Sequence, residues 1–134
     1  MRLPDADQAV VEKAKITEYL LSPDHPDGRS KAEFFVRFGF RQQNWEILAE
    51  ALRVHGAAHP VTRTAASQWG TRYSVDGALD CPDGRRPRLR SVWIVETFGV
   101  SEDGAPPRLI TASLIFIKFP ISFFSSSLKY FSPN

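Results

Sequence analysis

The chain has 134 residues, 43% of them hydrophobic and 24% charged, with a formal net charge of +2. This length suits one domain with a modest core of its own. Cys81 is the only cysteine in the sequence, which excludes an internal disulfide and a zinc site built from several cysteines. No apolar run approaches the roughly 20 residues that a membrane-spanning helix needs.

The first seven residues, MRLPDAD, include two acids and no apolar stretch. A secretory signal would need a basic start followed by an apolar segment, so none is expected. A single cysteine also suits a reducing compartment. The sequence therefore predicts a cytoplasmic protein.

Helices are predicted in the first half of the chain. Residues 12–21 carry a rough apolar face, and Ser22-Pro23 ends the pattern because proline disfavours helix in the residue before it. Residues 42–57 repeat apolar side chains at three- and four-residue spacing, which predicts a helix with one face in the core. His55 and His59, near the end of that helix, are interpreted as surface residues.

A further helix is predicted between these two, after a polar loop at residues 24–29. Ser30 and Glu33 have the spacing of a capping box, so this helix is expected to begin at Ser30. Gly39 fits the residue just past its end. Gly28, within the loop, is free to adopt a positive φ.

Strands are predicted for the second half. Residues 61–67 alternate weakly and suit an edge strand, whereas residues 71–79 alternate clearly. Pro82-Asp83-Gly84 predicts a turn into a strand at residues 88–97, whose apolar centre is typical of a central strand. A further strand begins at residues 108–112. The expected fold is α+β, with two to three N-terminal helices packed on a small antiparallel meander of about four strands.

The composition changes abruptly after residue 112. Residues 1–112 contain equal numbers of basic and acidic side chains, whereas residues 113–134 contain two lysines, no acid, five of the ten phenylalanines and six serines. We therefore expect a single globular domain at residues 1–112 and an atypical tail at residues 113–134. The tail is either a replaced or read-through end, or a true hydrophobic C-terminal strand or docking segment.

Several short motifs, taken together in order and spacing, resemble one bacterial family, "domain of unknown function 6883". The resemblance covers about residues 4–112, and family sequences tend to end soon after its last motif. The motifs are Asp5-Ala6-Asp7, Tyr19-Leu20-Leu21, His25-Pro26, Lys31-Ala32, Phe34-Phe35, Phe38-Gly39-Phe40, Trp45-Glu46, Gly70-Thr71-Arg72-Tyr73, Pro82-Asp83-Gly84-Arg85, Val92-Trp93 and Arg108-Leu109-Ile110-Thr111-Ala112.

The resemblance implies a toxin-like or toxin–antitoxin role, because family members resemble small bacterial proteins and the C-terminal domains of large secreted toxins. Helices followed by a small antiparallel sheet also resemble barnase- and RelE-like ribonucleases, which use no metal. Such enzymes need a base, an acid and cations around the reacting phosphate.

Four residues are candidates for that chemistry. His25 is interpreted as the acid or base, because imidazole titrates near neutral pH. Lys31, at a helix start, is expected to hold a phosphate against free N–H groups, and Arg72 to clamp it from a strand. Thr111 is expected to orient a hydroxyl. RNA is the implied partner, and no cofactor or metal is required.

These residues also have structural interpretations. His25 beside Pro26 is typical of a turn element, and the basic run at residues 85–90 is typical of a solvated hairpin. Trp45, Trp69 and Trp93 suit packing better than base stacking. The alternative to a ribonuclease is that the whole chain is a non-catalytic binding module, one half of a toxin–antitoxin-type pair with a small protein partner.

Overall fold

The computed structural model describes residues 1–97 and 105–115. Helices come first and strands follow, which confirms the predicted α+β class. The elements in chain order are the 3₁₀ turn η1 (Ala6–Gln8), α1 (Lys13–Lys15), the π-helical turn η2 (Ile16–Leu20), α2 (Arg29–Arg37), the 3₁₀ turn η3 (Gln42–Asn44), α3 (Trp45–Ala58), β1 (Val61–Ser67), β2 (Gly70–Ala78), β3 (Arg88–Glu96) and β4 (Arg108–Leu114).

The four strands form an antiparallel meander in the order β1-β2-β3-β4. β2 and β3 are central, and the predicted edge position of residues 61–67 is confirmed. The N-terminal segment partly covers the other edge, because Val10 bridges to Arg108 in parallel. The amide of Val10 donates to Pro107 O over 2.8 Å, and the amide of Leu109 donates to Val10 O over 3.0 Å.

A β-bulge divides β4. Trp93 faces Leu109, but the preceding residue of β3, Val92, faces Thr111, so Ile110 is the extra residue. The bulge lets both Leu109 and Ala112 turn toward the core, although they are three positions apart. Thr111 consequently falls on the opposite face.

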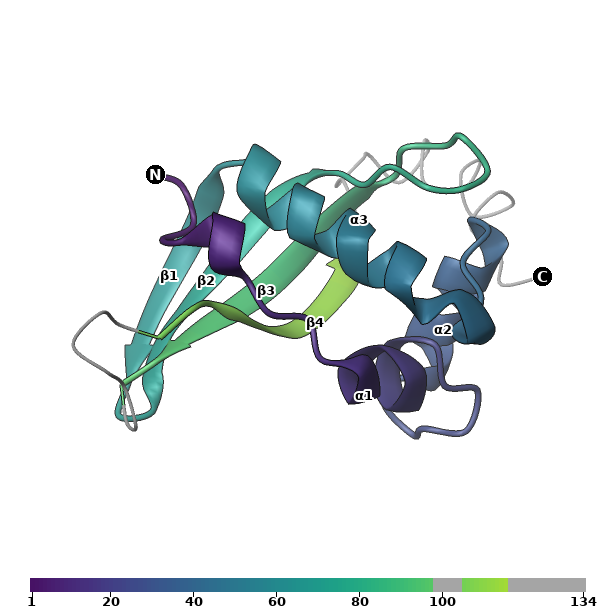
Figure 1. Cartoon of the computed structure of the whole chain (residues 1–134), viewed down its shortest axis with the longest axis horizontal. Helices are drawn as coiled ribbons and strands as arrows, with labels where there is room; N and C mark the ends of the chain where they lie inside the picture. The colour runs from purple at the N-terminus through teal and green to yellow at the C-terminus, as the bar shows by residue number, and fades with distance from the viewer. Residues whose placement is uncertain (98–104, 116–134) are drawn as a thin grey trace, which may run out of the picture.

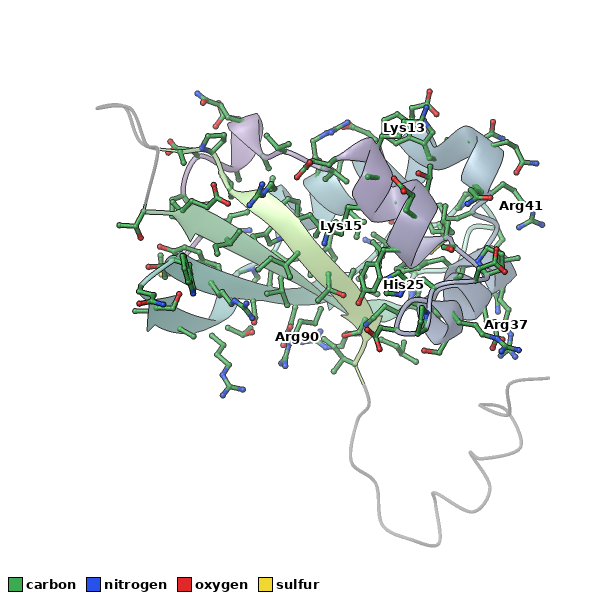
Figure 2. The ribbon with its side chains drawn as sticks, turned by 90° about the horizontal axis from the view of Figure 1, so that it is seen from below. Lys13, Lys15, His25, Arg37, Arg41 and Arg90 are labelled. Carbon is green, nitrogen blue, oxygen red and sulfur yellow. The ribbon has the colours of Figure 1, made fainter. Side chains whose placement is uncertain are left out.

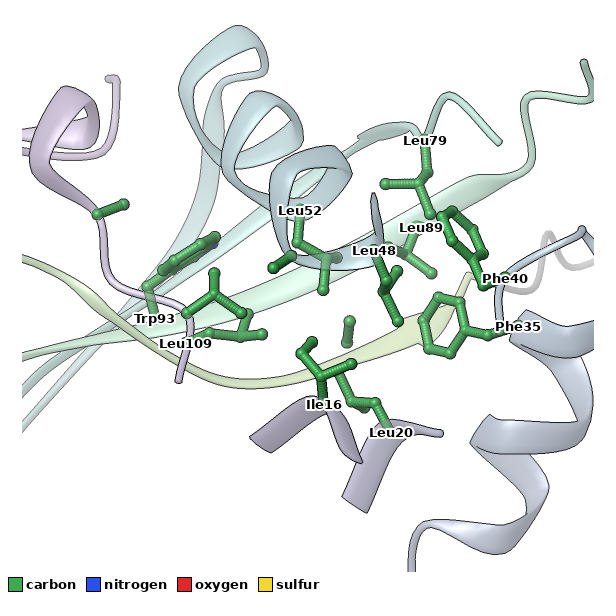
Figure 3. Packing of buried hydrophobic residues seen from close by; sticks show 14 of the residues in the cluster. Ile16, Leu20, Phe35, Phe40, Leu48, Leu52, Leu79, Leu89, Trp93 and Leu109 are labelled. Atoms are coloured by element: carbon green, nitrogen blue, oxygen red, sulfur yellow. The ribbon is translucent and has the colours of Figure 1, made fainter. Parts of the chain in front are cut away.

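The core lies between α3 and the sheet (Figure 3). Leu48 and Leu52 of α3 are fully buried against Leu89 and Trp93 of β3. Ile16, Leu20 and Phe35 close the core from the other helices, and Phe40 closes it from the loop after α2. Gly56 permits this packing, because a Cβ there would lie 2.7 Å from Cζ2 of Trp93. The helix and the sheet therefore approach closely at the Trp93 end.

All described helices lie on one face of the sheet (Figure 1). Strand alternation sends Val75, Leu89 and Trp93 to that face, where each is fully buried. The alternate residues of β2 and β3 point to the other face and are half-buried or exposed. The sheet thus has one apolar, covered side and one polar side.

The predicted capping box at Ser30 is wrong. α2 begins at Arg29, and its N-cap residue Gly28 makes no side-chain cap. Gly28 has a φ of −93°, so it does not use its freedom to adopt a positive φ. Glycine is required there for a different reason: a Cβ would lie 2.1 Å from the carbonyl oxygen of Tyr19. Gly39, in contrast, has the expected positive φ, 102°.

Two predictions about side-chain burial are also wrong. His55, expected on the surface, is 1% exposed, and Trp69, expected to pack, is 64% exposed. Amphipathic spacing predicts which face of a helix is buried, but it cannot show that a polar ring on that face finds buried partners. Trp93 is buried as expected.

β4 continues two residues beyond Ala112, to Leu114, and the amide of Ile115 donates to Arg88 O over 3.1 Å. The first residues assigned to the tail therefore belong to the sheet. Residues 116–134 lie outside the described residues, so the origin of the tail stays a prediction. Among the residues described, no helix is long and apolar enough to cross a membrane.

Candidate functional site

Polar side chains from five segments, β4 among them, meet at the edge of β4. The hydroxyl of Tyr19, on η2, lies 3.2 Å from Oγ1 of Thr111 on β4. The ring of His25 meets the Tyr19 ring edge to face, with centroids 5.0 Å apart. We call Lys15, Tyr19, His25, Lys31 and Thr111 the edge cluster.

His25 is fixed by the turn that precedes α2. Its Nδ1 accepts hydrogen bonds from the backbone N–H groups of Asp27 and Gly28, each over 3.0 Å. Because Nδ1 is an acceptor, the neutral ring carries its proton on Nε2. His25 therefore caps the turn through one nitrogen and offers an N–H donor at the other.

Two lysines bring positive charge to the edge cluster. Lys15 Nζ lies 5.3 Å from the centroid of the Tyr19 ring, a cation–π distance. Lys31 Nζ donates to the carbonyl oxygen of Ala112 over 3.4 Å. Figure 2 shows Lys15 and His25 on the same side of β4. An anion at this edge would meet two ammonium groups.

Three of the four predicted site residues, His25, Lys31 and Thr111, are thus neighbours along β4. Arg72 is not. It lies on β2 opposite Ile94, two strands away from β4 and toward the other end of the sheet. Two strand spacings amount to about 10 Å, so Arg72 does not lie directly beside Thr111.

Arg90 lies nearer to the edge cluster than Arg72 does. It faces Ser113 across the β3–β4 ladder and projects from the sheet on the side away from α3 (Figure 2). Its guanidinium donates two hydrogen bonds to Asp76, over 2.8 and 2.9 Å. The Arg90 hydrogen bonds hold the pKa of Asp76 below its ordinary value.

Other chemical groups are poorly placed for catalysis. Burial raises the pKa of Cys81 to about 11, so its thiol is protonated at neutral pH and is a poor nucleophile. In residues 1–97 and 105–115, no group of three or more His, Cys, Asp or Glu side chains is arranged to hold a metal ion.

The family model for DUF6883, a domain of unknown function, matches residues 2–115. This chain belongs to the DUF6883 family. The matched range ends at residue 115, which is the last residue that the structure describes and lies one position past β4. Residues 116–134 of the tail are thus outside both the family match and the described sheet.

No curated protein matches this DUF6883 chain. Among solved structures, it is similar to a chain described as "Contact-dependent growth inhibition toxin - immunity protein complex from Klebsiella pneumoniae 342". The TM-score is 0.59 at 19% sequence identity, and the match covers 77% of this chain and 96% of the other. At this identity the likeness shows a shared fold.

Sequence reasoning missed two members of the edge cluster in this DUF6883 domain. Tyr19 follows the apolar pattern of its helix, and its ring is indeed packed against the core, so nothing in the periodicity marks its hydroxyl. In the sequence, Lys15 has no feature that distinguishes it from an ordinary solvent-exposed lysine. Their proximity to Thr111 depends on a contact 92 residues apart in sequence, which only the folded chain reveals.

Proposed function

We propose that this domain is a toxin-type ribonuclease that cleaves RNA without a metal, and that the edge cluster is its active site. The observation that carries the proposal is the contact between the Tyr19 hydroxyl and Thr111, because it joins two lysines and a histidine to one stretch of β4. Proton-transfer groups and cations within one site are what such cleavage requires.

In this reaction the ribose 2′-hydroxyl attacks the adjacent phosphorus, and the 5′-oxygen leaves with a proton. The Tyr19 hydroxyl, oriented by Thr111, is the proposed proton-transfer group: its oxygen accepts the proton of the 2′-hydroxyl while its own proton passes to the leaving 5′-oxygen. His25 donates from Nε2 to a phosphate oxygen, since its Nδ1 is occupied by the turn. The ammonium groups of Lys15 and Lys31 stabilise the charge that builds on the phosphorane.

The first prediction concerns cleavage of a fluorescent RNA by the full chain with EDTA present. Tyr19→Phe should reduce kcat about 10²–10⁴-fold, the usual contribution of proton transfer. His25→Asn should reduce kcat about 10²-fold, the effect of losing one donor to an oxyanion. Asparagine keeps an acceptor for the turn amides, so the protein should stay folded by circular dichroism.

Lys13→Gln is the matched control, because Lys13 lies on the same short helix as Lys15 but contacts the ring of Trp45, 5.8 Å away. This variant should cleave at the wild-type rate. An RNA that stays intact at high enzyme concentration would exclude the activity. Full cleavage by the Tyr19→Phe variant would exclude the edge cluster as its site.

A second candidate function is binding of a small protein partner, and it rests on a groove beside α3. The groove has a volume of about 490 Å³, and Ile47 and Val54 on its wall are 50% and 51% exposed. Exposed apolar side chains that line one continuous groove are a feature of interaction surfaces. The similar chain from Klebsiella pneumoniae 342 is itself part of a toxin–immunity protein complex.

Binding can be tested by producing the chain together with the protein encoded beside it and measuring the mass of the complex. Ile47→Glu and Val54→Glu should each abolish a stable complex, because they place charge in an apolar interface. A monomer in every condition would exclude this function. A complex that survives both substitutions would move the interface elsewhere.

A further inference from the structure

The side of the sheet away from the helices carries a concentration of arginines. Strand pairing places one of them on β1, one on β2, two on β3 and one on β4, with Asp76 and Glu96 as the acids of the same face. We call this surface the arginine face, and its members are Arg63, Arg72, Arg88, Arg90 and Arg108.

Only part of this positive charge is neutralised. Arg90 pairs with Asp76, and Arg108 pairs with Glu96 and Glu12. Arg63, Arg72 and Arg88 form no ion pair with any residue in the described parts of the chain. Three guanidinium groups are therefore available to an anionic ligand.

The charge of the rest of the domain makes this excess significant. Residues 1–112 contain equal numbers of basic and acidic side chains, so a cationic excess on one face leaves an acidic excess elsewhere. Glu46 and Glu50 lie on α3, on the opposite side of the sheet. A polyanion approaching the domain is steered toward the arginine face.

We propose that the arginine face binds the phosphate backbone of single-stranded RNA. Guanidinium groups match phosphate oxygens bidentately. Small or aliphatic side chains lie between the arginines on this face of the sheet, namely Ala65, Val92 and Ile94. They leave apolar surface between the guanidinium groups. An extended single strand fits such a surface, because its phosphates contact arginines while its bases contact aliphatic groups.

The arginine face continues to the edge cluster. Thr111 faces Val92, and Ser113 faces Arg90, so the last part of β4 shares the same side of the sheet. A strand held across the face would reach the Tyr19–Thr111 contact at the edge of β4. This inference rests on the proposed function for its substrate, but binding is a separate property from cleavage.

The test uses a fluorescent RNA in which every 2′-hydroxyl is methylated, because this strand cannot be cleaved. Fluorescence anisotropy with the full chain should give a slope of log K against log salt of about −2, as expected when three phosphates of a single strand are neutralised. Arg63→Gln, Arg72→Gln and Arg88→Gln should each reduce the slope by roughly 0.7 and weaken binding to all sequences.

Arg53→Gln is the matched control, since Arg53 lies on α3 and pairs with Glu50. It should leave affinity and slope unchanged. Binding that is insensitive to all three arginine-face substitutions would overturn the proposal. Equal, arginine-dependent binding of polyglutamate would also overturn it, and would assign the face to an acidic protein. Retained binding with no cleavage of unmodified RNA would exclude only the ribonuclease function.

Discussion

His55 shows how a single buried side chain ties α3 to the sheet. The indole N–H of Trp93 donates to Ser91 Oγ over 2.9 Å, which leaves the Ser91 hydroxyl to donate to His55 Nδ1 over 2.9 Å. His55 Nε2–H then points at the carbonyl oxygens of Gly77 and Leu89, at 3.0 and 2.9 Å. Every group in this network has a partner when the imidazole is neutral.

The network predicts a pH dependence of stability. Burial lowers the pKa of His55 below its ordinary value of 6.5. As pH falls through 6.5, the unfolded chain takes up a proton that the folded chain does not, so the free energy of unfolding should fall by up to about 1.4 kcal/mol per pH unit. Above that pH the His55 contribution is constant.

Urea denaturation between pH 8 and pH 5 measures this slope. The His55→Gln variant should be less stable throughout but should lose the part of the slope that His55 supplies. Asp76 does not interfere, because its lowered pKa confines its effect to pH values below 3.8. A wild-type protein with equal stability at pH 8 and pH 5 would contradict a neutral, buried His55.

At the scale of elements, the loop between η2 and α2 depends on a close backbone approach. Gly28→Ala would place a Cβ 2.1 Å from Tyr19 O, which cannot move without shifting η2. We expect a loss of roughly 1–3 kcal/mol or more in the free energy of unfolding, measured by urea denaturation. Gly84→Ala is the comparison, because Gly84 has a φ of 88° but open space around it.

The Gly84 substitution should therefore cost only the backbone strain, about 1 kcal/mol. If Gly28→Ala were no worse than Gly84→Ala, the loop would be adaptable. Such a loop could not hold His25 in a fixed position beside Tyr19.

The elements themselves were largely predictable from the sequence. The four strands and the α3 helix follow from alternation and from three-four spacing, which are local properties of the chain. The start of α2 was not predictable in this way. Ser30 and Glu33 have the spacing of a capping box, but it is His25 Nδ1 that accepts hydrogen bonds from the amides of the turn before the helix.

The candidate site was predictable only in part, for the same reason. His25, Lys31 and Thr111 are chemically conspicuous, and the fold brings them near one another. Arg72 is equally conspicuous, but strand order and register separate it from them, and neither is encoded in local spacing. Tyr19 was missed because the apolar pattern accounts for its ring, whereas the contact of its hydroxyl with Thr111 leaves no signal in that pattern.

At the scale of the whole molecule, the described sheet ends at Leu114 and the family match ends at residue 115. Removal of residues 116–134 should leave the free energy of unfolding unchanged. Removal of residues 113–134 should lower it by about 1–2 kcal/mol, because it deletes the pairing of Leu114 with Leu89 and the Ile115 amide bond to Arg88. Thermal denaturation of both truncated chains measures the difference.

Equal stability of the two truncated chains would mean that the end of β4 contributes nothing to the fold. Loss of folding on removal of residues 116–134 alone would mean that the tail is part of the domain. That second result would favour a true C-terminal segment over a replaced end.

The extra residue in β4 also limits how this family can change. If β4 paired regularly through Ile110 instead of forming a bulge, the following side chains would exchange sides, so that the Thr111 hydroxyl would enter an apolar interior and Ala112 would leave it. A loss of the codon for Ile110 would remove the bulge but keep Leu109, Thr111 and Ala112 on their present sides, whereas a loss of the codon for Thr111 would remove the Tyr19 contact. Homologous chains should therefore have one or two residues between the positions of Leu109 and Ala112, whereas their loops should vary more widely in length.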